Sequence, residues 1–214
     1  MPGPENAYEI GKYPPVNQVP FLLSRASAIQ SYANLEFSLS FIFSNLLGAN
    51  IELGGLVFFR ITNTHSRRRI LDDLEEKKFG NSYDEFWNSA MSFVSTLDQR
   101  RNEIIHWHVV NNINLDLGHE HASSLSLRPP AGWATKSIAS IADVELNDFI
   151  ARCEFMSRLL NMFCAIVISP DEHFPKHLLP IWRNIFSQPI AYPPPDAHPL
   201  SPNYKEPQNP QQVG

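Results

Sequence analysis

The sequence predicts a mainly α-helical protein, a bundle of four to five helices with a small β-hairpin inserted after the third helix. Three observations lead to this fold class. No proline occurs from Phe21 to Arg128, whereas five fall in residues 1–20 and eleven from Pro170 onward. Apolar residues recur at three- and four-residue spacing in several long stretches, which is typical of helices packed on a core. One stretch in the middle alternates apolar and polar residues instead, which is typical of strands.

The first helix is expected from Phe21 to Leu47, a stretch without glycine or proline that is followed by Gly48. Glycine often ends a helix because it adopts left-handed backbone angles freely. Residues 35–43 also alternate with period two, but the length of the stretch and its lack of breakers favour a helix. Asn50 can cap a second helix, which we expect to run to about Lys78.

The third helix is expected to begin at a capping box, Ser82–Glu85. In this motif the Ser hydroxyl accepts from a free backbone N–H, and the Glu three residues on reciprocates. An apolar stripe follows, and the helix is expected to end near His106. From residue 107 to residue 128 the pattern changes to alternation with a break at Gly118, which predicts the β-hairpin.

Ser140 with Asp143 can cap a fourth helix. Its apolar residues follow a strong 3.6-residue period from Leu146 to Val167, and Ser169–Pro170 ends it. A short fifth helix is predicted around residues 177–186.

The chain therefore divides into an irregular N-terminal segment (1–17), one helical domain (18–186) and a proline-rich tail (187–214) that we expect to be disordered. No apolar run reaches the roughly 18–20 residues that span a bilayer, and no signal-peptide pattern opens the sequence. We therefore expect a cytoplasmic protein without a membrane partner. Cys153 and Cys164 lie about 16 Å apart along one predicted helix, too far for a disulfide, and are expected to be reduced.

The formal net charge is −5, which argues against a broad nucleic-acid surface driven by salt release. A local basic cleft is compatible with this charge, since four Arg and one His, with no acid, fall from Arg60 to Arg69. Four acidic residues follow at once in residues 72–76. The alternative is therefore a solvated helix face with internal ion pairs.

A motif that carries chemistry lies where the third helix is expected to end. From Arg101 it reads R-N-x-x-x-H, with Asn102 next to the arginine and His106 as the last residue. A histidine of near-neutral pKa suits proton transfer, and the planar fork of an arginine matches phosphate oxygens. Asn102 can donate or accept a hydrogen bond that orients either group.

On an ideal helix Asn102 and His106 share one face, and Asp98 extends this polar stripe by a turn. Arg101 lies about 140° away from His106, on the side of Leu97 and Ile105. Its side chain has to wrap round, or the helix has to loosen, or a second copy of the chain supplies one group. Because the stripe has no evident intramolecular purpose, we expect a symmetric homodimer with two motifs facing across the two-fold axis.

The motif and the helix order resemble those of HEPN (higher eukaryotes and prokaryotes nucleotide-binding) domains, small helical proteins many of which are metal-independent ribonucleases. The resemblance covers residues 21–168 in helix order and is specific only at Arg101–His106. It implies that Arg101, Asn102 and His106 are catalytic, with RNA as the substrate and no metal or cofactor. The products would be a 2′,3′-cyclic phosphate and a 5′-OH. It also suggests a toxin or phage-defence setting, with an antitoxin or regulatory protein as a partner.

Four further residues are candidates for support or RNA binding. Arg100 is a second candidate phosphate contact, and Glu36 can pair with Arg101 or Arg100 to hold it toward the cleft. Asp98 belongs to the polar stripe, and Arg67 belongs to the basic stretch. The alternative for each is an ordinary solvent-facing side chain.

Other interpretations of the sequence stay open. The main non-enzymatic one is a helical binding or scaffold module that has the HEPN fold but no catalytic activity. A metal site is another, because His106, His108, His119 and His121 form two i,i+2 pairs across the predicted hairpin, although no carboxylate or cysteine partner stands at ligand spacing. The tail, with Pro193–Pro195, could serve as a polyproline-type ligand.

Overall fold

The structure, a computed structural model, describes residues 18–113, 123–130 and 140–206. In this part the chain forms a mainly α-helical bundle with one two-stranded sheet, as the sequence predicts. The helices are α1 (Val19–Leu47), α2 (Ile51–Arg60), α3 (Thr64–Phe79), α4 (Asp84–His106), α5 (Asp143–Phe163) and α6 (Leu179–Ile185), and a π-helical turn, η3 (Cys164–Ile168), continues α5. The antiparallel strands are β1 (His108–Ile113) and β2 (Ser123–Arg128).

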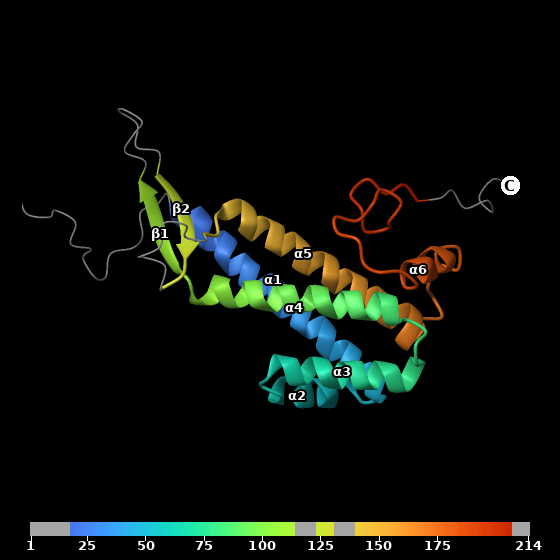
Figure 1. Ribbon diagram of the computed structural model, residues 1–214. Coiled ribbons are helices and arrows are strands. Elements are labelled where there is room, and N and C mark those ends of the chain that lie inside the picture. The colour runs from blue at the N-terminus through green and yellow to red at the C-terminus, as the bar shows by residue number, and fades with distance from the viewer. Residues whose placement is uncertain (1–17, 114–122, 131–139, 207–214) are drawn as a thin grey trace, which may run out of the picture.

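Three long helices, α1, α4 and α5, lie along one another, and α3 with α2 flanks them on one side (Figure 1). The hairpin β1–β2 projects from the end of the bundle at which α4 finishes (Figure 1). At the opposite end Phe163 is fully buried against Phe86 and Phe186, with ring centroids 4.9 and 5.1 Å away. The motif at the end of α4 therefore sits far from this aromatic core, next to the hairpin.

The first predicted helix is confirmed, whereas the second is divided in two. Gly48 ends α1 with a φ of 65°, and the Asn50 side chain caps α2 by accepting from the Glu52 N–H at 2.8 Å. The chain leaves the helix at residues 61–63, and Asn63 begins α3 by accepting from the Ser66 N–H at 3.1 Å. A side chain that satisfies the free N–H groups of a new helix lets the chain turn there, and the prediction overlooked this second cap.

The helix that carries the motif ends at His106, as predicted, but its predicted capping box is wrong. The Ser82 hydroxyl donates to the Phe79 carbonyl oxygen at 2.9 Å and does not cap α4. Tyr83 occupies the cap position without a side-chain bond. The hydroxyl thus closes the preceding turn, where a carbonyl at the end of α3 needs a donor.

Half of a capping box occurs at α5 instead. The Ala142 N–H donates to Glu145 Oε2 at 2.8 Å, so that the first turn of α5 is closed by a glutamate of its own. Ser140, the predicted cap, lies outside the helix, which begins at Asp143. The predicted fifth helix is confirmed as α6.

Both cysteines are buried and free. Burial raises the pKa of the Cys153 thiol to about 12 and that of Cys164 to about 11. The two cysteines are not bonded to each other, and neither thiol is poised as a nucleophile.

Residues 187–206 differ from the disordered tail that the composition suggests. Tyr192 packs between Phe93 of α4 and Phe155 of α5, with ring centroids 5.7 and 5.3 Å away. The Ile190 N–H donates to the Ser89 hydroxyl at 2.9 Å, so the segment is attached to α4 as well. A prediction from proline content does not take account of a single aromatic side chain that packs between two helices. The rest of the predicted tail, 207–214, and the N-terminal segment 1–17 lie outside the described residues.

None of the helices in the described part is long and apolar enough to cross a membrane by itself.

Candidate functional site

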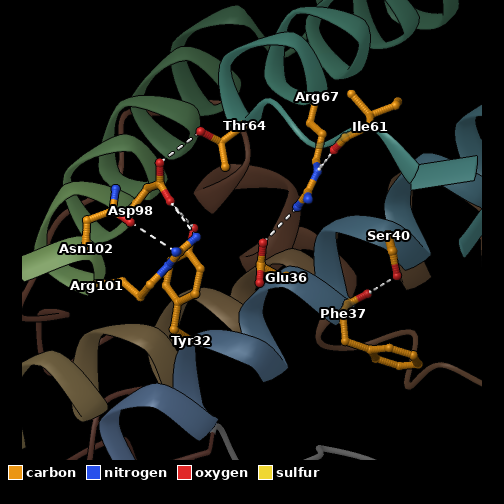
Figure 2. Close-up of polar contacts among 10 residues, drawn as sticks. All are labelled: Tyr32, Glu36, Phe37, Ser40, Ile61, Thr64, Arg67, Asp98, Arg101 and Asn102. Atoms are coloured by element: carbon orange, nitrogen blue, oxygen red, sulfur yellow. Dashed lines mark hydrogen bonds and ion pairs between the residues drawn. The ribbon is translucent and has the colours of Figure 1, made fainter. Parts of the chain in front are cut away.

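Asp98 lies at the centre of a polar cluster that joins three helices (Figure 2). From α1 the Tyr32 hydroxyl donates to Asp98 Oδ1 at 2.8 Å, and from α3 the Thr64 hydroxyl donates to Oδ2 at 3.0 Å. On α4 itself, Arg101 Nη2 pairs with Oδ1 at 3.2 Å. The carboxylate therefore has partners within the same chain. The homodimer was expected because the polar stripe had no evident intramolecular purpose, and for Asp98 this reason no longer applies.

Arg101 is held on three sides. Nη1 donates to Asn102 Oδ1 at 3.0 Å, Nη2 pairs with Asp98, and the guanidinium carbon lies 4.9 Å from the centre of the Tyr32 ring. The side chain is 22% exposed. It therefore turns back one helical turn toward Asp98, onto the face that carries Asn102. Within the described part of the chain, Arg101 Nε is buried without a hydrogen-bond partner.

Tyr32 is kept as a hydrogen-bond donor. Burial raises the pKa of its phenol well above the ordinary value, and the bond to Asp98 and the charges of Asp98 and Glu36 raise it further. The nearby Arg101 works in the opposite direction but does not reverse the shift. Tyr32 therefore stays protonated and positions Asp98 over the whole physiological pH range.

His106 is the last residue of α4 and is exposed, as is Asn102 one turn earlier. Among the described residues no side chain hydrogen-bonds His106, so its imidazole is open to a substrate. The end of the helix is fixed by Arg25 of α1, which donates to the carbonyl oxygens of Ile104 and Ile105, each at 2.9 Å, and of Trp107 at 3.2 Å. A cation at this position also complements the helix dipole.

The sequence suggested that Glu36 pairs with Arg101 or Arg100, but the structure shows a different partner. Its carboxylate binds Arg67 Nη1 at 2.8 Å, and Arg67 Nε donates to the Ile61 carbonyl oxygen (Figure 2). Arg67 also lies over the Phe58 ring, 5.1 Å from its centre. Both side chains of the pair are mostly covered, so Arg67 ties α3 to α1 and its charge is neutralised.

Arg100 belongs to a different face of α4. It pairs with Glu103 at 2.7 Å and lines a cavity of about 310 Å³ between α4 and α5, together with Glu145 and Arg152. The structure therefore brings Asp98, Arg101 and Asn102 together, and places His106 one turn beyond them. It places Arg100 outside the cluster and Glu36 with Arg67 in an adjacent ion pair.

The cluster has almost no empty space inside. The cavity among Tyr32, Thr64, Arg67 and Asp98 measures about 20 Å³, room for about one water molecule. A substrate therefore reaches this site only from outside, at the exposed Asn102 and His106.

A larger groove, of about 300 Å³, runs between α3 and α4. His65, Arg68 and Arg69 of α3 line it, with a single acid, Asp72, which accepts from the Trp87 indole N–H at 2.8 Å. On the α4 side the groove is lined by Met91, Ser92 and Ser95. The three consecutive arginines of the Arg60–Arg69 stretch thus differ in direction: Arg67 turns inward, and Arg68 and Arg69 face the groove.

Three residues of the site were missed from the sequence: Arg25, Tyr32 and Thr64. Tyr32 carried a weak signal, because it lies four residues before Glu36, the single acidic residue of this helix. Thr64 follows the cap residue Asn63, and Arg25 is a single basic residue near the start of α1. Neither has a local pattern that connects it with residues about 35 to 80 positions away.

No group of three or more His, Cys, Asp or Glu residues in the described ranges is arranged to hold a metal ion. His106 and His108 belong to these ranges, whereas His119 and His121 of the rival metal site, like the expected break at Gly118, lie outside the described residues.

Comparison of this chain with protein-family models, with curated proteins and with solved structures found no match. The fold and the site define a mainly α-helical bundle protein with an Arg-Asn-His motif at the exposed end of one core helix.

Proposed function

We propose that this chain is a metal-independent endoribonuclease of the HEPN type, with Arg101, Asn102 and His106 as its reacting set. The observation that supports the proposal most is the tethering of Arg101. Asp98 and Asn102 bind its guanidinium one turn before the open imidazole of His106. A cation of fixed position and a free proton carrier on the same helix end are the two groups that this chemistry requires.

In the proposed reaction His106 takes the proton of a ribose 2′-OH. The 2′-oxygen then attacks the adjacent phosphorus, the 2′-O–P bond forms and the P–O5′ bond breaks. Arg101 stabilises the charge that develops on the non-bridging phosphoryl oxygens, and Asn102 orients the arginine or the phosphate. The electron pair of the broken bond stays on the 5′-oxygen, which leaves as a hydroxyl once an acid supplies a proton.

The acid is part of the proposal of a homodimer. One motif offers one imidazole, so a second copy of the chain would supply the second His106 and divide the base and acid roles. For both imidazoles to act on one phosphate, the ends of α4 of the two copies must face each other.

The α3–α4 groove supports RNA as the substrate. Arg68 and Arg69 bring positive charge to a protein of net charge −5, and hydroxyl groups line the opposite wall. Polar residues continue along α4 from this groove to the motif at three- and four-residue spacing: Ser92, Ser95, Gln99, Asn102 and His106. A phosphate backbone that follows this stripe would reach Asn102 and His106.

A toxin or phage-defence setting, with an antitoxin or regulatory partner, belongs to the same proposal. It rests on the HEPN resemblance alone.

The proposal is tested with a short fluorescent RNA of mixed sequence. Wild-type protein is expected to cleave it equally well with and without EDTA, because arginine and histidine supply the charge and the proton transfer. The 5′ fragments are expected to end in a 2′,3′-cyclic phosphate and the 3′ fragments to begin with a 5′-OH. Full loss of activity in EDTA, or products with a 5′-phosphate, would contradict the mechanism.

The second candidate function is a binding or scaffold module without catalysis. One observation favours it: Asp98 already neutralises Arg101, and the cluster holds no substrate-sized cavity. In that case the wild-type protein and His106→Ala would bind RNA or a protein partner alike, and neither would cleave.

A further inference from the structure

An apolar surface covers the outer side of α2. Leu53, Leu56 and Val57 are 63, 59 and 50% exposed, and Ile51 and Phe59 are each 47% exposed. At 100° per residue Leu53 and Phe59 lie about 60° to either side of Leu56, whereas Val57 and Ile51 lie about 100° and 140° away from it. The three central side chains leave on the order of 300 Å² of apolar surface, the size of the largest patch on many monomers. We define Leu53, Leu56 and Phe59 as the α2 face.

The opposite side of α2 packs closely on α1, which fixes the direction of the α2 face. Phe58 is buried against Phe43, with ring centroids 5.6 Å apart. At Gly54 an added Cβ would lie 2.1 Å from the Ser44 hydroxyl oxygen, so only glycine allows the two helices to approach this closely. Gly54 and Phe58 are four residues apart and point inward, and the residues half a turn away must point outward.

The middle of the α2 face is flanked by two opposite charges. Glu52, Leu56 and Arg60 follow one another at four-residue spacing and share one side of the helix. Both charged residues are exposed, and neither makes a side-chain ion pair within the described residues. Leu56 is the midpoint of the pair.

With this spacing, the charges of α2 are complementary to those of a second α2 that lies antiparallel to the first. A two-fold axis through Leu56 places residue 56 − n of one copy opposite residue 56 + n of the other. Glu52 then faces Arg60 of the second copy, and Leu53 faces its Phe59. The charges therefore complement each other twice around an apolar centre.

We propose that the α2 face is a homodimer interface, in which the α2 helices of two copies pack antiparallel about a two-fold axis at Leu56. A stable interface buries about 800 Å² per partner, and the α2 face would supply the apolar centre of such an area. Glu52 and Arg60 form its rim and fix the antiparallel direction.

A lipid surface is a poorer match for the same residues. Helices that bind membranes by one face carry several Lys or Arg along their polar border, whereas α2 has only Arg60, balanced by Glu52. Together α1 and α2 are long and apolar enough to span a membrane, but the chain bends by 117° between them.

This surface is separate from the end of α4, where the proposed cleavage step places the two-fold axis. The two axes define different dimers, and a dimer that Leu56→Asp leaves intact would favour the end of α4. The α2 interface rests on exposure and charge spacing and holds whether or not the chain cleaves RNA.

The test uses the full-length chain in analytical ultracentrifugation. Wild type is expected to be dimeric at micromolar concentration, and Leu56→Asp is expected to weaken dimerisation at least 100-fold, because a charge would be buried at the axis. The control is Val144→Asp on α5, where a valine is 70% exposed outside the α2 face. This variant is expected to remain dimeric. Circular dichroism checks that each variant is folded.

The charge pairs give a second test that a folding defect cannot imitate. Glu52→Arg alone and Arg60→Glu alone each place like charges opposite one another, and each is expected to weaken dimerisation roughly tenfold or more. Mixing the two variants is expected to restore the dimer as a heterodimer, since opposite charges then face each other at both ends.

Three results would overturn the proposal: a monomeric wild type, a dimer that Leu56→Asp leaves intact, or single-charge variants that fail to pair on mixing. If wild type were a monomer that co-floats with phosphatidylcholine–phosphatidylserine vesicles, and if Leu56→Asp abolished this binding, the face would be assigned to membranes instead.

Discussion

Asp98 and Arg101 stand one turn apart on α4, and their ion pair of 3.2 Å makes the orientation of the arginine depend on two other helices. The same carboxylate accepts from Tyr32 of α1 and Thr64 of α3. The arginine of the motif is therefore positioned by the tertiary structure and not by α4 alone.

The first prediction concerns this carboxylate. Asp98→Ala leaves Arg101 without its counter-charge and two hydroxyls without their acceptor, and should destabilise the fold by about 2–4 kcal/mol. Asp148→Ala is the matched control, because Asp148 forms an exposed pair with Arg152 on α5 and such pairs contribute about 0–1 kcal/mol. Urea denaturation measures both. Equal losses for the two variants would show that the cluster does not stabilise the bundle.

Arg101→Ala should reduce RNA cleavage by roughly 10²-fold or more and also lower the melting temperature. The second effect follows from the structure, since the arginine is mostly covered and stacks on Tyr32. Steady-state cleavage and thermal unfolding on the same preparation separate the two effects. A fall in melting temperature at unchanged cleavage would make Arg101 purely structural.

Arg25→Ala should loosen the end of α4, because three carbonyl oxygens lose a charged donor. The expected cost is about 1–2 kcal/mol. Hydrogen exchange should become faster at residues 104–107 and stay unchanged in the middle of α4. Arg158→Ala, at an exposed position of α5, serves as the control. Unchanged exchange at the end of α4 would show that the Arg25 contacts do not hold it.

Glu75 predicts a pH dependence of stability. It is a buried residue of α3 whose carboxyl pKa is raised from 4.5 to about 7, first by burial and then by the charges of Asp84, Asp72 and Glu76. A pKa that is higher in the folded state favours folding below pH 4.5, and this contribution is lost as the pH rises through 7. The loss is at most about 3 kcal/mol.

Glu75→Gln should therefore be more stable than wild type at pH 8 and should remove this part of the pH dependence between 4.5 and 7. Glu76→Gln, at the exposed neighbouring position, should leave most of the dependence in place, because the charge of Glu76 is the last of the causes and burial is the first. Denaturant midpoints at pH 5 and pH 8 measure the difference. A wild type that gains as much stability between these pH values as Glu75→Gln does would contradict the raised pKa.

Most of the fold could be predicted from the sequence because its signals are local. Gly48, Asn50 and the 3.6-residue period of α5 each act within a few residues, and the structure agrees with them. The errors arise where one side chain has two possible partners. Ser82 closes the preceding turn, although a capping box was open to it, and Asn63 begins a new helix inside a stretch that was read as one.

The site was predictable only as a set of residues. The sequence shows that Asp98, Asn102 and His106 share a face of one helix. It does not show that Tyr32 and Thr64 come from other helices to Asp98, or that Glu36 chooses Arg67 over Arg101. These choices depend on how α1, α3 and α4 cross, which is decided by packing over the whole bundle.

The central claim, an RNA-cleaving site at the end of α4, is tested most directly by one comparison of cleavage rates. Purified wild type, His106→Ala and His173→Ala are incubated with the same labelled RNA. His173 is an exposed histidine near α6 and serves as the control. The proposal predicts cleavage by wild type and His173→Ala, and a rate at least 10²-fold lower for His106→Ala at an unchanged melting temperature. Equal cleavage by His106→Ala and wild type would contradict the assignment of this motif as the catalytic site.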